Sequence, residues 1–309
     1  MKLLITGASG FIGTHLIREL SKQDEILAID IIEPQIKNSN IKFLKADITN
    51  INDLKSVINT APPDLENISE HNHILEDNNI NNNFKNIDGI IHLAAVSRVS
   101  DAVQNPQKTI NINILGTLNL LELARKNNCW FILGSTIEPP NNLYGLTKQF
   151  SNNLTKHYAE NFNLKTLVLK FSGIFGSGDN PNKLIPKLIR EAMNNQEIKI
   201  NSPETKFDFI FIEDLIQGIK KAVEFVQSPS ENKTYDEIPL ASGKLISMKQ
   251  IAEIIIQKTN SDSELIKGNQ PEEIRDFYDY KKAEEVLNWK PEISFEEGVR
   301  RVVESFREN

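Results

Sequence analysis

The chain has very little cysteine and no surplus of positive charge. Cys129 is the single cysteine among 309 residues, which excludes an intramolecular disulfide and a cysteine-based zinc site. The 42 acidic side chains outnumber the 35 basic ones, and the net charge of −7 offers little attraction for nucleic acid or an anionic membrane. We therefore expect no nucleic-acid partner, no metal site and a reducing compartment.

Long apolar runs are also missing. The apolar stretch at Met1–Thr6 is interrupted at Gly7, which is too early for a signal peptide. No other stretch approaches the roughly 18–20 apolar residues that a membrane-spanning helix needs. These absences predict a soluble, cytoplasmic protein without membrane contact, whose length allows one large domain or two small ones.

Asparagine, by contrast, is abundant. The chain contains 35 asparagines, and they concentrate in residues 61–86, where two prolines occur and no helical or strand periodicity is visible. Such a composition is typical of a surface insertion without a packed core. We read the surplus as a bias of composition that says little about chemistry.

The first half of the chain alternates short apolar runs with amphipathic stretches. Strands followed by helices of this length predict right-handed crossovers and an α/β, Rossmann-type, doubly wound parallel sheet. We expect strands at Lys2–Thr6, Glu25–Asp30, Ile41–Lys45, Ile87–Ala94, Trp130–Gly134 and Lys165–Phe171, and helices at Phe11–Ser21, Asp53–Ile58, Pro106–Arg125, Tyr144–Asn161 and Lys183–Asn194.

After about residue 172 the rhythm changes to shorter, less regular elements. We therefore expect a dinucleotide-binding domain at residues 1–172 and a smaller substrate-binding lobe at 173–309. Some strands and helices of the second part can return to the first domain. An amphipathic helix is expected at Glu296–Asn309.

A glycine-rich turn follows the first strand, with glycines at Gly7, Gly10 and Gly13 ahead of a helical pattern. Glycine permits a tight turn and a close approach of backbone N–H groups to a pyrophosphate, and the helix N-terminus adds partial positive charge. The second strand ends at Asp30, 17 residues after Gly13, where a carboxylate can bind the ribose hydroxyls of an adenosine. No basic residue directly follows Asp30, which favours NAD over NADP.

Tyr144 and Lys148 open a helix with i,i+4 spacing, so the phenol and the ammonium share one face. A nearby ammonium would lower the pKa of the phenol and allow it to take a proton from a substrate hydroxyl. The same spacing recurs at Tyr278 and Lys282, but only Tyr144 follows a strand at the ligand-binding edge of the sheet.

Taken together, these motifs resemble the extended short-chain dehydrogenase/reductase family, in particular its NAD-dependent epimerase/dehydratase branch. The resemblance covers nearly the whole chain. It rests on Thr6–Gly13, Asp30, Ala46–Ile48, Ile91–Ala95, Asn113–Thr117, Ser135–Thr136, Tyr144 with Lys148, Ser172–Gly176, Phe207–Asp214, and Lys282 to Pro291.

The resemblance implies specific roles. Tyr144 would be the acid/base, Thr136 would hydrogen-bond the reacting oxygen and Lys148 would hold the nicotinamide ribose. His92 is expected to be a packed strand residue and Asn113 to secure a helix. The residues implied to bind NAD are Gly7, Gly10, Phe11, Ile12, Gly13, Asp30, Asp47, Ile48, Ala94, Ala95 and Lys148.

The departures from the family pattern concern the substrate. Gly173 stands where an Asn is usual, and Phe207 and Gln270 stand where arginines are usual. Arginine forks suit a diphosphate, so their loss weakens the case for a nucleotide-sugar. Lys206, Lys183 or Arg275 can substitute for them. We assign Gly173, Lys183 and Arg275 to the substrate site.

Three functions remain open from the sequence. The first is an NAD-dependent nucleotide-sugar 4-epimerase, in which tightly bound NAD transiently oxidises a sugar hydroxyl. The second is an NAD-dependent dehydrogenase/reductase acting on a substrate without a nucleotide, and the third is a non-catalytic NAD sensor. Dehydration is disfavoured, because Ile137 replaces the first acid of the pair that follows the Thr in 4,6-dehydratases. The resemblance also implies a homodimer formed through helices Pro106–Arg125 and Tyr144–Asn161.

Overall fold

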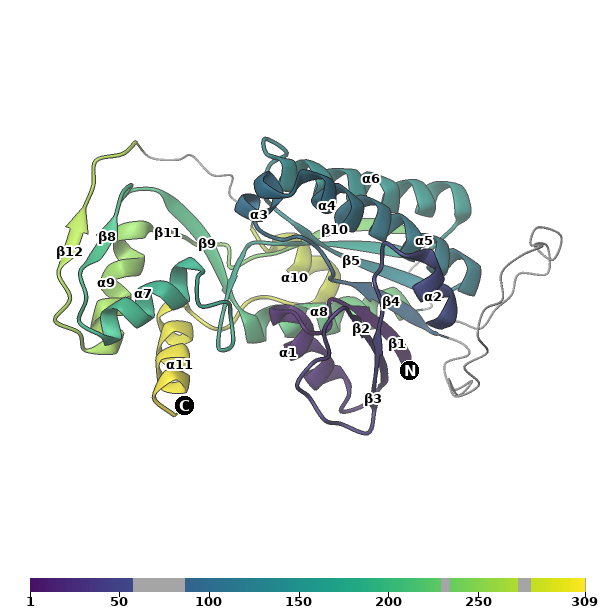
Figure 1. Cartoon of the computed structure of the whole chain (residues 1–309), viewed down its shortest axis with the longest axis horizontal. Coiled ribbons are helices and arrows are strands. Elements are labelled where there is room, and N and C mark those ends of the chain that lie inside the picture. The colour runs from purple at the N-terminus through teal and green to yellow at the C-terminus, as the bar shows by residue number, and fades with distance from the viewer. Residues whose placement is uncertain (58–86, 229–233, 272–278, 309) are drawn as a thin grey trace.

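A seven-stranded parallel sheet forms the centre of the molecule (Figure 1). The computed structural model describes residues 1–57, 87–228, 234–271 and 279–308. The strand order β10-β6-β5-β4-β1-β2-β3 reverses direction between β1 and β4, as in the doubly wound fold that we expected. The strands are β1 (Lys2–Thr6), β2 (Glu25–Asp30), β3 (Ile41–Lys45), β4 (Gly89–His92), β5 (Trp130–Thr136), β6 (Thr166–Phe171) and β10 (Tyr235–Leu240).

Helices cover both faces of this sheet, and each face has its own apolar core. Leu3 and Ile5 of β1 belong to one cluster, together with α1 and α8, whereas Leu4 belongs to the other cluster, together with α5. This alternation follows from the period of two in a strand. The helices are α1 (Phe11–Leu20), α2 (Ile51–Val57), α3 (Val99–Gln104), α4 (Pro106–Ile110), α5 (Gly116–Asn127), α6 (Leu143–Phe162), α7 (Leu184–Met193), α8 (Ile212–Gln227), α9 (Met248–Thr259), α10 (Lys281–Leu287) and α11 (Phe295–Glu308).

The later part of the chain builds a smaller assembly beside the sheet, on the left in Figure 1. It contains a three-stranded sheet of order β11-β9-β7, a two-stranded sheet of β12 and β8, and helices α7, α9 and α11. The strands are β7 (Gly173–Phe175), β8 (Ile198–Ile200), β9 (Lys206–Phe211), β11 (Leu245–Ser247) and β12 (Leu265–Lys267). Strand β10 comes later in the chain than β9, yet it pairs with β6 of the large sheet.

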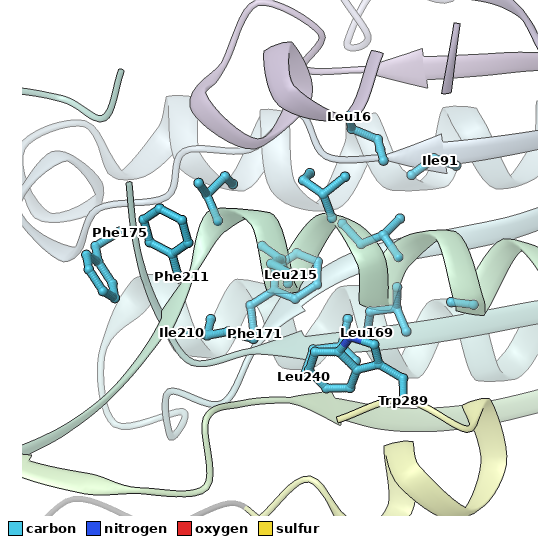
Figure 2. Packing of buried hydrophobic residues seen from close by; sticks show 14 of the residues in the cluster. Leu16, Ile91, Leu169, Phe171, Phe175, Ile210, Phe211, Leu215, Leu240 and Trp289 are labelled. Carbon is cyan, nitrogen blue, oxygen red and sulfur yellow. The ribbon is translucent and has the colours of Figure 1, made fainter. Parts of the chain in front are cut away.

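One apolar core continues from the large sheet into the smaller assembly. Figure 2 shows Leu215 of α8 in the same cluster as Leu16 of α1 and Leu169 of β6, and the cluster extends to Phe175 and Phe211. Phe175 and Phe211 pair in the β7–β9 ladder and are almost completely buried. Because this packing continues across residue 172, the domain boundary that we expected there stays a prediction from the sequence.

The expected helix Pro106–Arg125 contains a π-helical turn, η1 (Asn111–Leu115), between α4 and α5. The carbonyl of Asn113 accepts hydrogen bonds from the side-chain hydroxyls of Thr117 and Ser151, both at 2.6 Å. The Asn113 side chain binds both backbone groups of Val96, which lies in the loop after β4. Asn113 therefore ties this helical run to the loop after β4, and its carbonyl accepts two side-chain hydroxyls at the π-helical turn.

Asparagine has a structural use that the composition did not reveal. All five described non-glycine residues with positive φ are asparagines, at positions 128, 163, 195, 260 and 288. Four of them cap the C-termini of α5, α6, α9 and α10 in the left-handed conformation. Asparagine tolerates this conformation better than other side chains. Part of the surplus therefore ends helices, which corrects our reading of it as composition bias alone.

Several expectations concern features outside the catalytic region. Cys129 is buried, and burial raises the pKa of its thiol to about 12. The reactive thiolate therefore does not form at neutral pH. The proposed insertion at residues 61–86 lies outside the described residues. Within the described ranges, no helix combines the length and apolar character needed to cross a membrane.

Candidate active site

A cleft of about 1410 Å³ opens along the carboxyl ends of the central strands and reaches β7 and β9. This edge is where ligands bind in open α/β sheets. Every described residue that we assigned to the site from sequence lines it, whereas Arg275 lies outside the described residues. The lining includes Gly7, Gly10, Phe11, Ile12, Gly13, Asp30, Asp47, Ile48, Ala94, Ala95, Thr136, Tyr144, Lys148, Gly173 and Lys183.

The glycine turn at one end of the cleft leaves no room for side chains. A Cβ on Gly7 would lie 2.7 Å from the Ala94 nitrogen, and φ at Gly7 is +70°. A Cβ on Gly13 would lie 2.0 Å from the Gly7 carbonyl oxygen. Gly10 precedes α1 without any side-chain cap on the helix N-terminus. The first N–H groups of α1 are therefore available for an anion such as a pyrophosphate.

Asp30 is held in place at the end of β2. Its carboxylate accepts hydrogen bonds from the Ser9 N–H at 3.0 Å and from the Ile31 N–H at 2.7 Å. Further along the wall, the Ile48 carbonyl accepts a hydrogen bond from the Asn119 side chain, and Ile48 fills the space beside Gly116. A glycine cradle, a fixed carboxylate and a buried apolar residue are the features that NAD requires, so these residues fit that cofactor.

Thr136 and Tyr144 meet in the middle of the cleft. Asn142 caps α6 by accepting a hydrogen bond from the Gly145 N–H at 2.9 Å, so that Tyr144 lies in the first turn of the helix. Burial raises the pKa of Tyr144 to about 12, and a side-chain hydrogen bond with Thr136 opposes this shift. In the ligand-free protein burial therefore outweighs any effect of Lys148, and the expected lowering of the Tyr144 pKa beside a bound nicotinamide stays a prediction.

Lys148 lies one helical turn after Tyr144 and is almost completely buried. Its ammonium donates a hydrogen bond to the Gly134 carbonyl at 2.6 Å. Burial lowers the pKa of Lys148 to about 8, because the charged form loses its hydration. The ammonium is thus directed at the end of β5 in this state.

His92 is a packed strand residue, as we expected. Its ring nitrogens contact the hydroxyls of Thr6 at 2.7 Å and Thr117 at 3.1 Å. Burial and the nearby Lys148 charge lower the pKa of His92 to about 3, which keeps the imidazole neutral. His92 therefore links Thr6 of β1 to Thr117 of α5 beneath the cleft and does not line the cleft itself.

The end of the cleft formed by β7 and β9, where we expect the substrate, is aromatic. The rings of Phe207 and Phe209 stack with centroids 5.7 Å apart and an interplanar angle of 28°. A Cβ on Gly173 would lie 2.8 Å from the Phe209 ring and 2.9 Å from the Asp208 carbonyl oxygen. In this structure a side chain at position 173 would therefore overlap both the Phe209 ring and the Asp208 backbone.

The cations expected to replace the missing arginines are placed differently. The Lys183 ammonium lies 2.9 Å from the Asp179 carboxylate and 5.4 Å from the centre of the Phe11 ring. Lys206 is exposed and does not line the cleft.

Sequence reasoning missed Arg98, Lys108 and Asp179, all of which line the cleft. Arg98 carried one usable signal, because it follows the fourth strand at the ligand-binding edge. In the described part of the chain, no group of three or more His, Cys, Asp or Glu side chains could hold a metal ion.

Comparisons with known proteins agree with this geometry. The model of the NAD-dependent epimerase/dehydratase family matches residues 3–66 and 69–236. The chain is 28% identical to a UDP-glucuronate 4-epimerase of Thermodesulfobacterium geofontis, over 99% of this chain and 96% of that protein. It is 26% identical to a dTDP-glucose 4,6-dehydratase of Salmonella typhimurium, over 100% of this chain and 93% of that protein.

A solved structure shows the same fold. The UDP-glucose 4-epimerase of Thermotoga maritima superimposes with a TM-score of 0.81 and 22% identity, covering 100% of this chain and 99% of that one. The family match extends over both the glycine turn and the Tyr144–Lys148 region. The chain is therefore an enzyme that belongs to the NAD-dependent epimerase/dehydratase family.

Proposed function

We propose that the protein is an NAD-dependent nucleotide-sugar 4-epimerase. The observation that carries this proposal is that one cleft joins the glycine turn and Asp30 to Thr136, Tyr144 and Lys148. A cofactor bound along Gly7–Gly13 with its ribose on Asp30 would extend toward Tyr144. The named relatives that act on UDP-glucuronate and UDP-glucose support the choice of substrate class.

In this proposal NAD supplies a reversible hydride acceptor, and the protein manages the proton. Tyr144 takes the proton from the substrate hydroxyl as the sugar is oxidised to a ketone. It returns the proton to the oxygen after the ketone has rotated and presents its other face. Thr136 positions that oxygen through its hydroxyl group. Both side chains are half-buried in the wall of the cleft, so a bound substrate would cover them and limit exchange of the proton with water.

Tyr144 needs a lower pKa than it has in the ligand-free protein. Burial holds its pKa at about 12, whereas a base at neutral pH must lose its proton readily. Lys148 is the nearest candidate for a stabilising charge on the same helix, and an oxidised nicotinamide adds a second positive charge. We propose that ligand binding, and not the protein alone, makes Tyr144 competent as a base.

The substrate end favours a second candidate, a dehydrogenase/reductase acting on a substrate without a nucleotide. Phe207, which stacks on Phe209, presents a ring at a position where the family usually carries an arginine, and rings attract phosphate poorly. A dehydratase is less well supported, since Ile137 replaces the first acid after Thr136.

The test uses the purified protein with whatever dinucleotide it retains, which is released and identified. UDP-, TDP- and GDP-sugars are then followed by NMR without added cofactor. Isomerisation that falls about 100- to 10,000-fold in Tyr144→Phe supports the epimerase. Tyr158→Phe is the matched control, because Tyr158 lies on the same helix and bonds Glu122 outside the cleft. Turnover that consumes NAD(H) stoichiometrically would favour the dehydrogenase/reductase.

We also propose that the protein is a homodimer that pairs through α6 and the helical run of α4, η1 and α5. Leu146 and Phe150 lie one turn apart on α6 and are 40% and 52% exposed. Ile110 and Leu115, at the start of the neighbouring helical run, are similarly exposed. Phe150→Glu should convert a dimer into a monomer in light scattering, and a wild-type monomer would contradict the proposal.

A further inference from the structure

We propose that Arg98 binds the phosphate group of the substrate, in place of the guanidinium that is missing from β9. The inference rests on the proposed function, because it concerns the ligand of the same cleft. It assigns the anion to the wall formed by α3 and α4, opposite to the aromatic residues of β9.

The cationic side chains of the cleft differ in how they are engaged. Among the residues that the structure describes, Arg98, Lys108, Lys148 and Lys183 line the cleft. The Lys148 ammonium donates to the Gly134 carbonyl, and the Lys183 ammonium is neutralised by Asp179. No described residue forms a hydrogen bond or an ion pair with the Arg98 guanidinium. The positive charge that remains uncompensated is therefore on the α3–α4 wall.

Arg98 is mounted on a fixed segment of backbone. Its carbonyl accepts the Ala102 N–H at 3.0 Å as α3 begins. Two residues earlier, Val96 exchanges hydrogen bonds of 2.8 and 3.1 Å with the Asn113 side chain. Arg98 is half-buried, whereas Lys108 is exposed. A half-buried side chain has less conformational freedom to lose on binding than an exposed one, which makes Arg98 the better anion site of the two.

The opposite wall excludes an anion and suits an uncharged ring. Phe207 and Phe209 both line the cleft, and the next aromatic residues, Phe175 and Phe295, pack behind Phe209. The rings themselves offer a phosphate no hydrogen-bond donor in return for its lost hydration. A sugar or a base can instead place its apolar face on the rings. The planar guanidinium of Arg98 matches two phosphate oxygens at once.

The experiment measures binding of UDP, TDP and GDP to the NAD-loaded protein by titration calorimetry. Charged hydrogen bonds contribute about 1.5–3 kcal/mol, so Arg98→Met should weaken the binding of the preferred nucleotide about ten- to 100-fold. Arg98→Lys keeps the charge without the fork and should recover part of the affinity. Arg18→Met is the matched control, since Arg18 is exposed on α1 and does not line the cleft.

Three results would overturn the assignment. The first is nucleotide binding that Arg98→Met and Arg98→Lys leave unchanged. The second is an Arg98→Met protein, freed of bound dinucleotide, that loses as much affinity for NAD as it loses for the nucleotide. That result would assign Arg98 to the cofactor. The third is a wild-type protein that binds none of the three nucleotides. Binding through Arg98 without sugar isomerisation would instead reject the proposed epimerase and leave the anion site standing.

Discussion

The two ends of the cleft differ in what constrains their residues. At the cofactor end, a Cβ on Gly7 or Gly13 would meet backbone atoms, and Asp30 is held by two backbone N–H groups. At the substrate end, a Cβ on Gly173 would meet the ring of Phe209 as well as one carbonyl oxygen. Backbone atoms cannot be exchanged by mutation, whereas a side chain can. A side chain at Gly7 or Gly13 would therefore meet backbone that cannot be replaced, whereas one at Gly173 would meet a ring that a second substitution can make smaller.

The largest effect expected is that of Gly7→Ala. The new methyl group would overlap the Ala94 backbone, and the positive φ adds strain, so we expect destabilisation of at least about 3 kcal/mol and loss of retained NAD. Gly178→Ala is the control, because φ there is +83° but the space is open. That variant should lose only about 1 kcal/mol in denaturant unfolding. Equal losses in the two variants would show that the backbone contact is unimportant.

Asp30→Ala should alter the cofactor end without disturbing the substrate end. Removal of the charged acceptor for the ribose hydroxyls should weaken NAD binding about ten- to 100-fold and improve the ratio of NADP to NAD affinity. Glu33→Ala removes the same charge from an exposed position nearby and should leave both affinities unchanged. Calorimetric titration of the ligand-free protein measures the effect. An unchanged cofactor preference would remove Asp30 from the ribose site.

Gly173→Ala tests whether the substrate end is constrained mainly by a side chain. The methyl group would press on the Phe209 ring, and we expect a cost of about 2 kcal/mol in the free energy of unfolding. Phe209→Leu in the same chain should recover about 1 kcal/mol of it, measured as the coupling in a double-mutant cycle. Additive costs would mean that the Asp208 carbonyl dominates, and the contrast with Gly7 would then disappear.

The smallest effect expected concerns the pH dependence of stability in the ligand-free protein. The folded-state pKa of Lys148 is about 8, below its ordinary value of 10.5. Above pH 8 the unfolded chain therefore binds a proton that the folded protein has released, and stability should rise with pH. The contribution is about 1 kcal/mol between pH 8 and pH 9. Lys148→Met should lack this increment, and identical pH profiles for the two proteins would contradict the buried ammonium.

Much of the fold was readable from local patterns. Each expected strand is present with ends within two residues of our assignment, because buried strands between turn residues have a clear signature. The π-helical turn η1 was not readable, since it depends on the hydroxyls of Thr117 and Ser151 meeting the Asn113 carbonyl. Ser151 is distant in the sequence, so no local pattern predicts its contact with Asn113.

The site divides in the same manner. Gly7, Asp30 and Tyr144 were found from sequence because spacing along strand, turn and helix determines their positions. The raised pKa of Tyr144 and the lowered pKa of Lys148 were not, because burial determines both shifts. The i,i+4 spacing places the two residues on one face of the helix. It does not predict that the Lys148 ammonium donates its hydrogen bond to the Gly134 carbonyl.

The sequence by itself determined the class of fold, the glycine turn and the position of Tyr144 and Lys148 on one helix, since these depend on neighbours in the chain. Only the tertiary structure decided which charges of the cleft are neutralised and which remain. Lys183 is paired with Asp179, Phe207 stacks on Phe209, and Arg98 faces the cleft from a backbone that Asn113 holds. The paired residues are near one another in the chain, but the packing around them decides whether their side chains meet, and electrostatic compensation depends on distance in space.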